Sequence, residues 1–315
     1  MFIEKISNTG LAQKPTRLLS AAIKTHRFWG CVMVSTLLLS AAPGYTRVTA
    51  ANSLNTQDSI RIPFEIERSR IFIEAMVNDR GPFRFMVDTG ASGIGRADVR
   101  LVKQLQLKQS GSASNSDGVN TATVPLVHLE SLKIGRLVQE NVDVMSRDYN
   151  RNATSDTKLR MGIIGRDFFI DWLLTINYTN RELLLSRGSL KSSGQNIVSF
   201  ERPIVIPIVL GDYPSEGFVD TGSTVEMHLP LEWAKKLGVR ELVEAGEARR
   251  ANTVFKMYTC LIPVQIEIAG NKIKQVNAHF SERANRINIG GRLLANNGFI
   301  LTLDQKEQLI DFRLP

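Results

Sequence analysis

The sequence predicts an all-β protein built from two copies of one unit. Short apolar and β-branched segments, separated by turn residues, recur along the chain, and this pattern is typical of strands. Helical periodicity is sparse by comparison. The chain also matches itself at an offset of about 130 residues, which indicates an internal duplication.

Local patterns predict the elements of the first copy. Asn, Asp, Gly and Pro gather between two apolar segments and predict a turn, while a polar segment rich in Ser and Asn predicts a loop or hairpin tip after a short helix. A Gly- and Ser-containing segment near the middle of the chain predicts a linker. The expected ranges are strands at 60–67, 70–77 and 83–87, a turn at 78–82, the polar segment at 110–118 and the linker at 187–199.

The internal repeat is clearest around one short motif. Residues 85–92 match residues 217–224 at an offset of 132, and residues 174–177 match residues 301–304 at an offset of 127. The drift between the two offsets is what insertions in loops produce. Two weaker matches support the same alignment, Lys103-Gln-Leu with Lys235-Lys-Leu and Ile134-Gly with Ala269-Gly.

Each copy carries Asp-Thr-Gly directly after an apolar strand end. If the two copies pack about a twofold axis, equivalent residues near that axis meet, so Asp88 faces Asp220. Two adjacent carboxyls share a proton, because both cannot ionise cheaply, and such a pair acts as acid and base at one site. Glycine after each threonine permits a close turn of the backbone, and the hydroxyls of Thr89 and Thr221 are placed to brace the loops.

These motifs resemble those of aspartic peptidases of the pepsin and retropepsin clan. Val-Asp-Thr-Gly-Ala-Ser at 87–92, followed by Ile-Ile-Gly at 163–165 and a closing hairpin at 174–185, is similar to a bacterial retropepsin-like domain. The resemblance implies two similar β-barrel-like lobes related by a pseudo-twofold axis, with the active site between them. It also implies an aspartic endopeptidase that needs no cofactor or metal and acts on a peptide or protein substrate. Its catalytic residues are Asp88 and Asp220, its active loops contain Thr89, Gly90, Ala91, Thr221, Gly222 and Ser223, its supporting elements contain Ile163, Ile164, Gly165, Ile289 and Gly290, and a flap tip falls at Asp117 and Gly118.

The second half departs from the family pattern in two places. Asn288 stands where an apolar residue is expected, and a shifted register that uses Ile287 would compensate for it. Ser223 replaces the alanine found at the same place in the first motif, Ala91. A serine hydroxyl there would donate to Asp220 and favour its charged form. We therefore expect Asp88 to hold the shared proton more often.

The charge and the rare residues exclude several classes of function. Of the net charge of +8, residues 1–50 contribute +5 and the remainder +3, so the basic charge does not indicate a nucleic-acid partner. Only Cys260 lies outside the N-terminal segment, which excludes an internal disulfide and a cysteine zinc site. The histidines lack metal-ligand spacing.

The N-terminal 50 residues resemble an export signal. Basic residues precede an apolar segment of about 12 to 15 residues and then small residues, which predicts a cleaved signal peptide and an exported, periplasmic or secreted protein. The alternative is a membrane anchor formed by residues 28–42. The predicted domains are therefore a signal or anchor at 1–50, an N-terminal lobe at 51–186, a linker at 187–199 and a C-terminal lobe at 200–315.

Two other functional interpretations stay open at this stage. One is a peptide-binding protein that has the fold but no catalytic activity, because the second half is irregular. The other is a homodimer that pairs the first motif of two chains. Since the second motif supplies a partner carboxyl within the same chain, a monomer is the favoured assembly.

Overall fold

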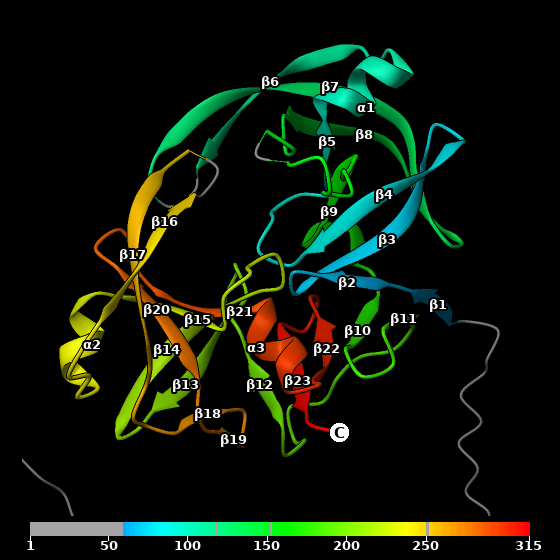
Figure 1. Ribbon diagram of the computed structural model, residues 1–315. Helices are drawn as coiled ribbons and strands as arrows, with labels where there is room; N and C mark the ends of the chain where they lie inside the picture. Colours follow the sequence, from blue (N-terminus) through cyan, green and yellow to red (C-terminus); the bar gives the residue numbers. More distant parts are fainter. Residues whose placement is uncertain (1–58, 117–118, 152, 250–251) are drawn as a thin grey trace, which may run out of the picture. The chain divides into compact units, whose positions relative to one another are not determined.

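Strands make up most of the structure. The computed structural model describes residues 59–116, 119–151, 153–249 and 252–315. Within these ranges the strands form sheets of eight, nine and six members (Figure 1). The helical elements are short: α1 (Val99–Leu105), α2 (Glu232–Lys236), α3 (Gly291–Asn296) and the 3₁₀ helix η2 (Arg166–Phe169). The prediction of an all-β protein is confirmed.

The eight-stranded sheet carries the first Asp-Thr-Gly motif. Its interior strand β4 runs parallel to β9, so that Asp88 lies opposite Gly165, and β5 runs antiparallel to β9 and parallel to β8. This arrangement places the motif at the end of a strand in the interior of the sheet. The strands in order across the sheet are β2 (Glu65–Glu67), β3 (Arg70–Val77), β4 (Arg80–Asp88), β9 (Gly162–Gly165), β5 (Gly95–Asp98), β8 (Leu137–Arg147), β7 (Thr121–Ile134) and β6 (Gln109–Ser116).

The nine-stranded sheet carries the second motif in the same local arrangement. Strand β14 runs parallel to β21, which places Asp220 opposite Gly290, and β15 runs antiparallel to β21 and parallel to β20. The strands in order are β16 (Val243–Arg249), β17 (Val254–Leu261), β20 (Asn277–Ser281), β15 (Met227–Pro230), β21 (Ile287–Gly290), β14 (Tyr213–Asp220), β13 (Val205–Leu210), β18 (Ile266–Ile268) and β19 (Asn271–Ile273).

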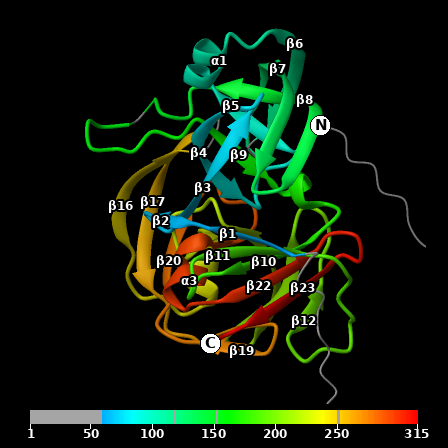
Figure 2. The ribbon, with the colours of Figure 1, turned by 90° about the vertical axis from the view of Figure 1, so that its right-hand side faces the viewer.

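The six-stranded sheet combines strands from both ends of the described chain (Figure 2). At its centre β10 and β22 are antiparallel, and Thr175 lies directly opposite Thr302 with their hydroxyls 2.9 Å apart. These threonines occupy equivalent places in the two segments that match at an offset of 127 in the sequence. The strands in order are β1 (Ile60–Pro63), β11 (Glu182–Ser186), β10 (Leu173–Asn177), β22 (Ile300–Asp304), β23 (Leu309–Arg313) and β12 (Ile197–Ser199).

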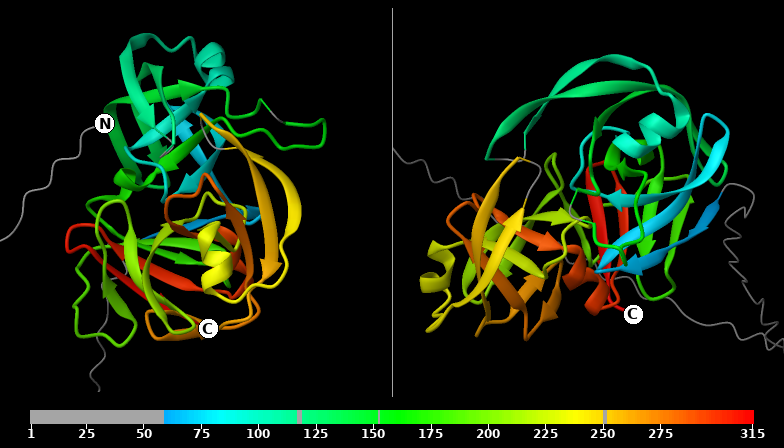
Figure 3. Two further views of the ribbon diagram at one scale, coloured as in Figure 1. Left: turned by 90° about the vertical axis from the view of Figure 1, so that its left-hand side faces the viewer. Right: turned by 45° about the horizontal axis from the view of Figure 1, so that its top comes forward.

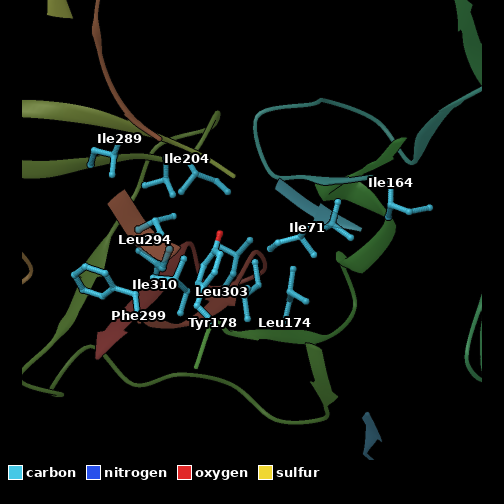
Figure 4. Packing of buried hydrophobic residues seen from close by; sticks show 14 of the residues in the cluster. Ile71, Ile164, Leu174, Tyr178, Ile204, Ile289, Leu294, Phe299, Leu303 and Ile310 are labelled. Carbon is cyan, nitrogen blue, oxygen red and sulfur yellow. The ribbon is translucent and has the colours of Figure 1, made fainter. Parts of the chain in front are cut away.

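One cluster of buried apolar side chains joins the three sheets. Figure 4 shows part of it, including Ile71 of β3, Ile204 before β13 and Leu303 of β22. Burial alternates along β10 and β11, as expected for strands that turn one face to the core. Each fully buried aliphatic side chain contributes about 1.5–3 kcal/mol. The core therefore holds the two motif-bearing sheets in contact.

Three local predictions differ from the structure. The turn at 78–82 is a two-residue hairpin in which Asn78 and Asp79 have φ of 50° and 56°, and β4 already begins at Arg80. Asn and Asp tolerate this left-handed geometry, which tight hairpins require. The polar segment 110–118 mostly forms strand β6, because backbone pairing with β7 needs no apolar side chains. The last residues of the expected linker form β12, which pairs with β23.

Several predictions concern residues outside the described ranges. The signal or anchor at 1–50 and the flap-tip residues Asp117 and Gly118 belong to this group, so export and membrane anchoring stay predictions. In the described part of the chain, no helix combines the length and apolar character needed to cross a bilayer.

Candidate active site

The two Asp-Thr-Gly loops meet face to face. A Cβ atom built on Gly90 would lie 2.7 Å from Asp220 Oδ1, and one built on Gly222 would lie 2.5 Å from Asp88 Oδ2. Each glycine therefore packs against the carboxyl group of the opposite loop. The lack of a side chain at both positions is what allows the two carboxyls to approach each other.

Two threonines fix the loops to one another. The amide of Thr89 donates to Thr221 Oγ1 at 3.0 Å, and the amide of Thr221 donates to Thr89 Oγ1 at 3.2 Å. Each hydroxyl in turn donates across the interface to a strand carbonyl, that of Val219 at 3.3 Å or that of Val87 at 3.2 Å. Both threonines are buried, and these bonds satisfy their polar groups.

The carboxyl of Asp88 favours its protonated form. Burial, and secondly the charge of Asp220, raise the pKa of Asp88 to about 7. The amides of Gly90 and Ala91 donate to Asp88 Oδ1 at 2.9 Å and 3.1 Å, and such hydrogen bonds favour the ionised carboxyl. The neighbouring guanidinium of Arg70 also opposes the rise. Because two adjacent carboxyls cannot both ionise without a large cost, Asp88 keeps its proton to a higher pH than a free carboxyl does.

Asn288 distinguishes the second half of the site from the first. It lies opposite Phe218 just as Ile163 lies opposite Met86, so the register of β21 is not shifted. The expected compensation by a shifted Ile287 is therefore wrong. Asn288 instead turns its amide toward the site, and Nδ2 donates to Asp220 Oδ2 at 3.0 Å.

Ser223 does not make the bond expected from the sequence. Its amide donates to the backbone carbonyl of Asp220 at 3.2 Å, but among the described residues no hydrogen bond joins its hydroxyl to the Asp220 carboxyl. The side-chain donor to Asp220 is Asn288. The sequence marked Asn288 as an irregular position, but only the register shows that its amide reaches the aspartate.

Two arginines hold the carbonyls of the active loops. Arg70 Nε donates to the carbonyl of Gly222 at 2.8 Å, and Arg166 Nη1 approaches the carbonyl of Gly90 at 3.3 Å. Arg166 is itself held by Gln305, whose amide donates to its backbone carbonyl at 2.5 Å. Arg70 lies outside the motifs, and Arg166 directly follows the Ile-Ile-Gly element, but the sequence pattern assigns no role to either side chain.

The predicted supporting elements lie under the loops. Ile163, Ile164 and Ile289 are buried, and the two glycines that follow Ile164 and Ile289 contact the loop backbone. A Cβ atom on Gly165 would overlap the carbonyl oxygen of Gly93, and one on Gly290 would overlap that of Val225. Glycine is needed at both places because the active loops rest directly on these strands.

A cleft of about 850 Å³ opens in front of the aspartates. Hairpin β6–β7 and hairpin β16–β17 border it and approach each other at their ends (Figure 3). Asn252 Nδ2 donates to the carbonyl of Asn115 at 2.8 Å, and Asn120 Nδ2 donates to Thr253 Oγ1 at 3.1 Å. The sequence predicts a flap only in the first half and carries no signal for the contribution of β16–β17.

Potential metal ligands are not gathered in the portion of the chain that the structure describes. There, no group of three or more His, Cys, Asp or Glu side chains is placed to hold a metal ion. The groups that converge between the two loops are the carboxyls of Asp88 and Asp220.

Comparison with known proteins supports part of this description. No curated protein matched the chain. Residues 73–168 match a family model described as Aspartyl protease. The matched segment runs from β3 to η2 and contains Asp88 and the Ile-Ile-Gly element, but it ends before Asp220. For this segment the match supports membership of a retropepsin-like aspartyl protease family.

Proposed function

We propose that the protein is an aspartic endopeptidase in which a water molecule is activated between Asp88 and Asp220. The observation that carries the proposal is the face-to-face packing of the two Asp-Thr-Gly loops, with each glycine against the opposite carboxyl. The family match of the first half agrees with it.

The two carboxyls have different roles in this mechanism. As the water attacks, protonated Asp88 transfers its proton to the carbonyl oxygen of the scissile peptide, while ionised Asp220 takes a proton from the water. The water oxygen bonds to the carbonyl carbon and gives a tetrahedral intermediate with no covalent link to the protein. When the C–N bond breaks, the nitrogen takes the proton held by Asp220, and the carbonyl oxygen returns its proton to Asp88. Both carboxyls thus regain their starting states.

We also propose that the two halves are related by a pseudo-twofold axis. Three pairs of equivalent residues support this proposal. In each pair, the residue from one half meets its counterpart in the other half, as residues near a twofold axis do. The pairs are Asp88 with Asp220, Thr89 with Thr221, and Thr175 with Thr302. On this proposal the N-terminal lobe is centred on the eight-stranded sheet and the C-terminal lobe on the nine-stranded sheet, and one chain contains a complete site.

The function is tested by incubating the purified full chain with a peptide library between about pH 3 and 8, a range that spans the ordinary pKa of a carboxyl and the raised pKa of Asp88. We expect cleavage within peptides, detected by mass spectrometry as paired fragments whose masses add to that of the peptide plus one water. A chain that binds peptides in a pull-down but cleaves none of them over this pH range would instead support the inactive peptide-binding alternative.

The pH profile provides a second prediction. Because Asp88 must be protonated, kcat/KM is expected to fall as pH rises through about 7. Asn288→Leu removes the donor to Asp220 Oδ2 and so disfavours the ionised carboxyl. The acidic limb of its profile is expected to move to higher pH, because one hydrogen bond to the ionised form is lost.

Ser223→Ala is the matched control for this shift. Its hydroxyl makes no bond to Asp220 among the described residues, so its acidic limb should stay where it is in the wild type. An unmoved limb in Asn288→Leu would contradict the role assigned to Asn288, and a moved limb in Ser223→Ala would show that the serine hydroxyl acts on Asp220.

A further inference from the structure

The cleft in front of the aspartates carries an excess of positive charge. Of its lining residues within the described ranges, eight are Arg or Lys and four are Asp or Glu. Two of these acids pair with arginines that do not line the cleft, Glu67 with Arg84 at 2.7 Å and Asp148 with Arg100 at 2.9 Å. The other two are the paired aspartates. Arginine and lysine thus outnumber aspartate and glutamate in this lining, where Lys158 in turn pairs with Glu65 outside it at 3.2 Å.

Three of the arginines form no direct salt bridge among the described residues. Arg70, Arg96 and Arg160 have no acidic oxygen within ion-pairing distance among the described residues. Arg96 is only 8% exposed and donates to uncharged acceptors. Arg160 donates to the carbonyl of Tyr149, and its Nε is buried without a partner in the described structure. Removing guanidinium groups from water without an anion is costly, so the site is suited to an anionic ligand.

Apolar side chains line the cleft beside Arg160. Phe72, Met86 and Ile163 form a small buried cluster, with Tyr149 packed against it. Arg160 reaches this cluster directly, since its Nη1 lies 3.5 Å from Met86 Sδ. Burial raises the pKa of Tyr149, and the positive charges that oppose the rise are those of Arg96, Arg147 and Arg160.

We propose that the Asp88 side of the cleft binds an acidic side chain, above all glutamate, of the substrate residue beside the scissile bond. This inference rests on the proposed peptidase function. The methylene groups of glutamate match the apolar floor formed by Met86 and Ile163, and its carboxylate matches the guanidinium groups of Arg160 and Arg96. Aspartate carries the same charge on a shorter stem and reaches these groups less well.

The test compares peptides that differ at one residue. A cleaved peptide is resynthesised with Glu, Gln or Lys next to the scissile bond, with both ends capped so that only the side chain carries the charge. Wild-type kcat/KM is expected to be about 10- to 100-fold higher for Glu than for Gln, and lowest for Lys. Equal kcat/KM for the Glu and Gln peptides would overturn the proposal. So would faster cleavage of a peptide that has a neutral side chain at this position and an uncapped C-terminus, because the cleft would then recognise a terminal carboxylate.

Variants at Arg160 connect this preference to the structure. Arg160→Gln should reduce the Glu-to-Gln ratio to below about 3, while Arg160→Lys, which keeps the charge, should retain most of it. Arg61→Gln is the matched control, because Arg61 is exposed, pairs with Glu182 and lies outside the cleft. An unchanged ratio in Arg160→Gln would contradict the assignment of the acidic side chain to this pocket.

A binding measurement separates this inference from the peptidase proposal. If the wild type cleaves no peptide, the proposed function fails, but fluorescence anisotropy with labelled Glu and Gln peptides still measures recognition. We expect the Glu peptide to bind at least about 10-fold more tightly, with an affinity that weakens as salt is added. Equal binding of the two peptides would overturn the acidic-substrate inference independently of any cleavage.

Discussion

Asp88→Asn and Asp220→Asn are each expected to lower kcat by about 10³-fold or more while leaving the fold intact. Asparagine has nearly the same shape as aspartate, so it can still accept the loop amides of Gly90 or Gly222. It can neither release nor take up a proton in the way the mechanism requires. Peptide cleavage rates and circular dichroism, measured on the same preparations, check both parts of this prediction.

Asp212→Asn serves as the control for the chemical change. Asp212 is exposed and lies in the turn between β13 and β14, outside the cleft. Its variant should cleave at the wild-type rate. Cleavage above about one tenth of the wild-type rate in Asp88→Asn or Asp220→Asn would mean that the altered carboxyl is not part of the acid–base pair.

Gly222→Ala is expected to reduce kcat by about 100-fold or more, although the change adds a single methyl group. The new Cβ would lie 2.5 Å from Asp88 Oδ2, and no tolerated contact is that short. Either the second loop or the Asp88 carboxyl must move. A displacement of about 1 Å is enough to misalign two carboxyls that act on one water molecule. Steady-state kinetics and a thermal denaturation curve distinguish misalignment from unfolding.

Gly111→Ala is the matched control for this substitution. Gly111 lies in β6, and a Cβ there would come no closer than 3.9 Å to any neighbour, Leu126 Cδ1. This variant should stay within about twofold of the wild-type rate. If Gly222→Ala retained the same activity as Gly111→Ala, the close packing of glycine against the opposite carboxyl would not matter for catalysis.

The repeat in the sequence predicted which residues the structure brings together. Asp88 and Asp220 occupy equivalent places in the proposed duplicated unit, and equivalent residues meet when two copies pack symmetrically. The same reasoning reached Thr89 and Thr221, whose hydrogen bonds depend only on residue type and place in the repeat. Symmetry therefore makes long-range contacts readable from a single sequence.

Contacts that differ between the two halves could not be predicted from the internal repeat. Asn288 reaches Asp220 only because β21 keeps the register of β9, and a slip of one residue would turn its side chain to the opposite face. Arg70 donates to the carbonyl of Gly222, which lies 152 residues further along the chain. This separation differs from the repeat offset of about 130 residues, so the repeat does not predict the bond. Strand β17 alternates buried Phe255 and Met257 with exposed residues, but this pattern predicts only a strand and not its position beside the cleft.

The positive charge of the cleft could not be predicted from the amino-acid composition. The sum of charges over residues 51–315 is small, and it suggests no anionic partner. The fold gathers Arg70, Arg96 and Arg160 around one apolar floor, although they come from separate strands and loops. A net charge averages over the surface, whereas recognition depends on where the charges lie.

Mixing the two aspartate variants tests most directly whether one chain holds a complete catalytic pair. Asp88→Asn and Asp220→Asn proteins are combined in equal amounts over a range of concentrations, and peptide cleavage is measured beside that of the wild type. A pair contained in one chain predicts no activity in the mixture at any concentration and a wild-type specific activity that is independent of concentration. Cleavage restored by mixing, or full activity of Asp220→Asn alone, would contradict this account and place the pair between two chains.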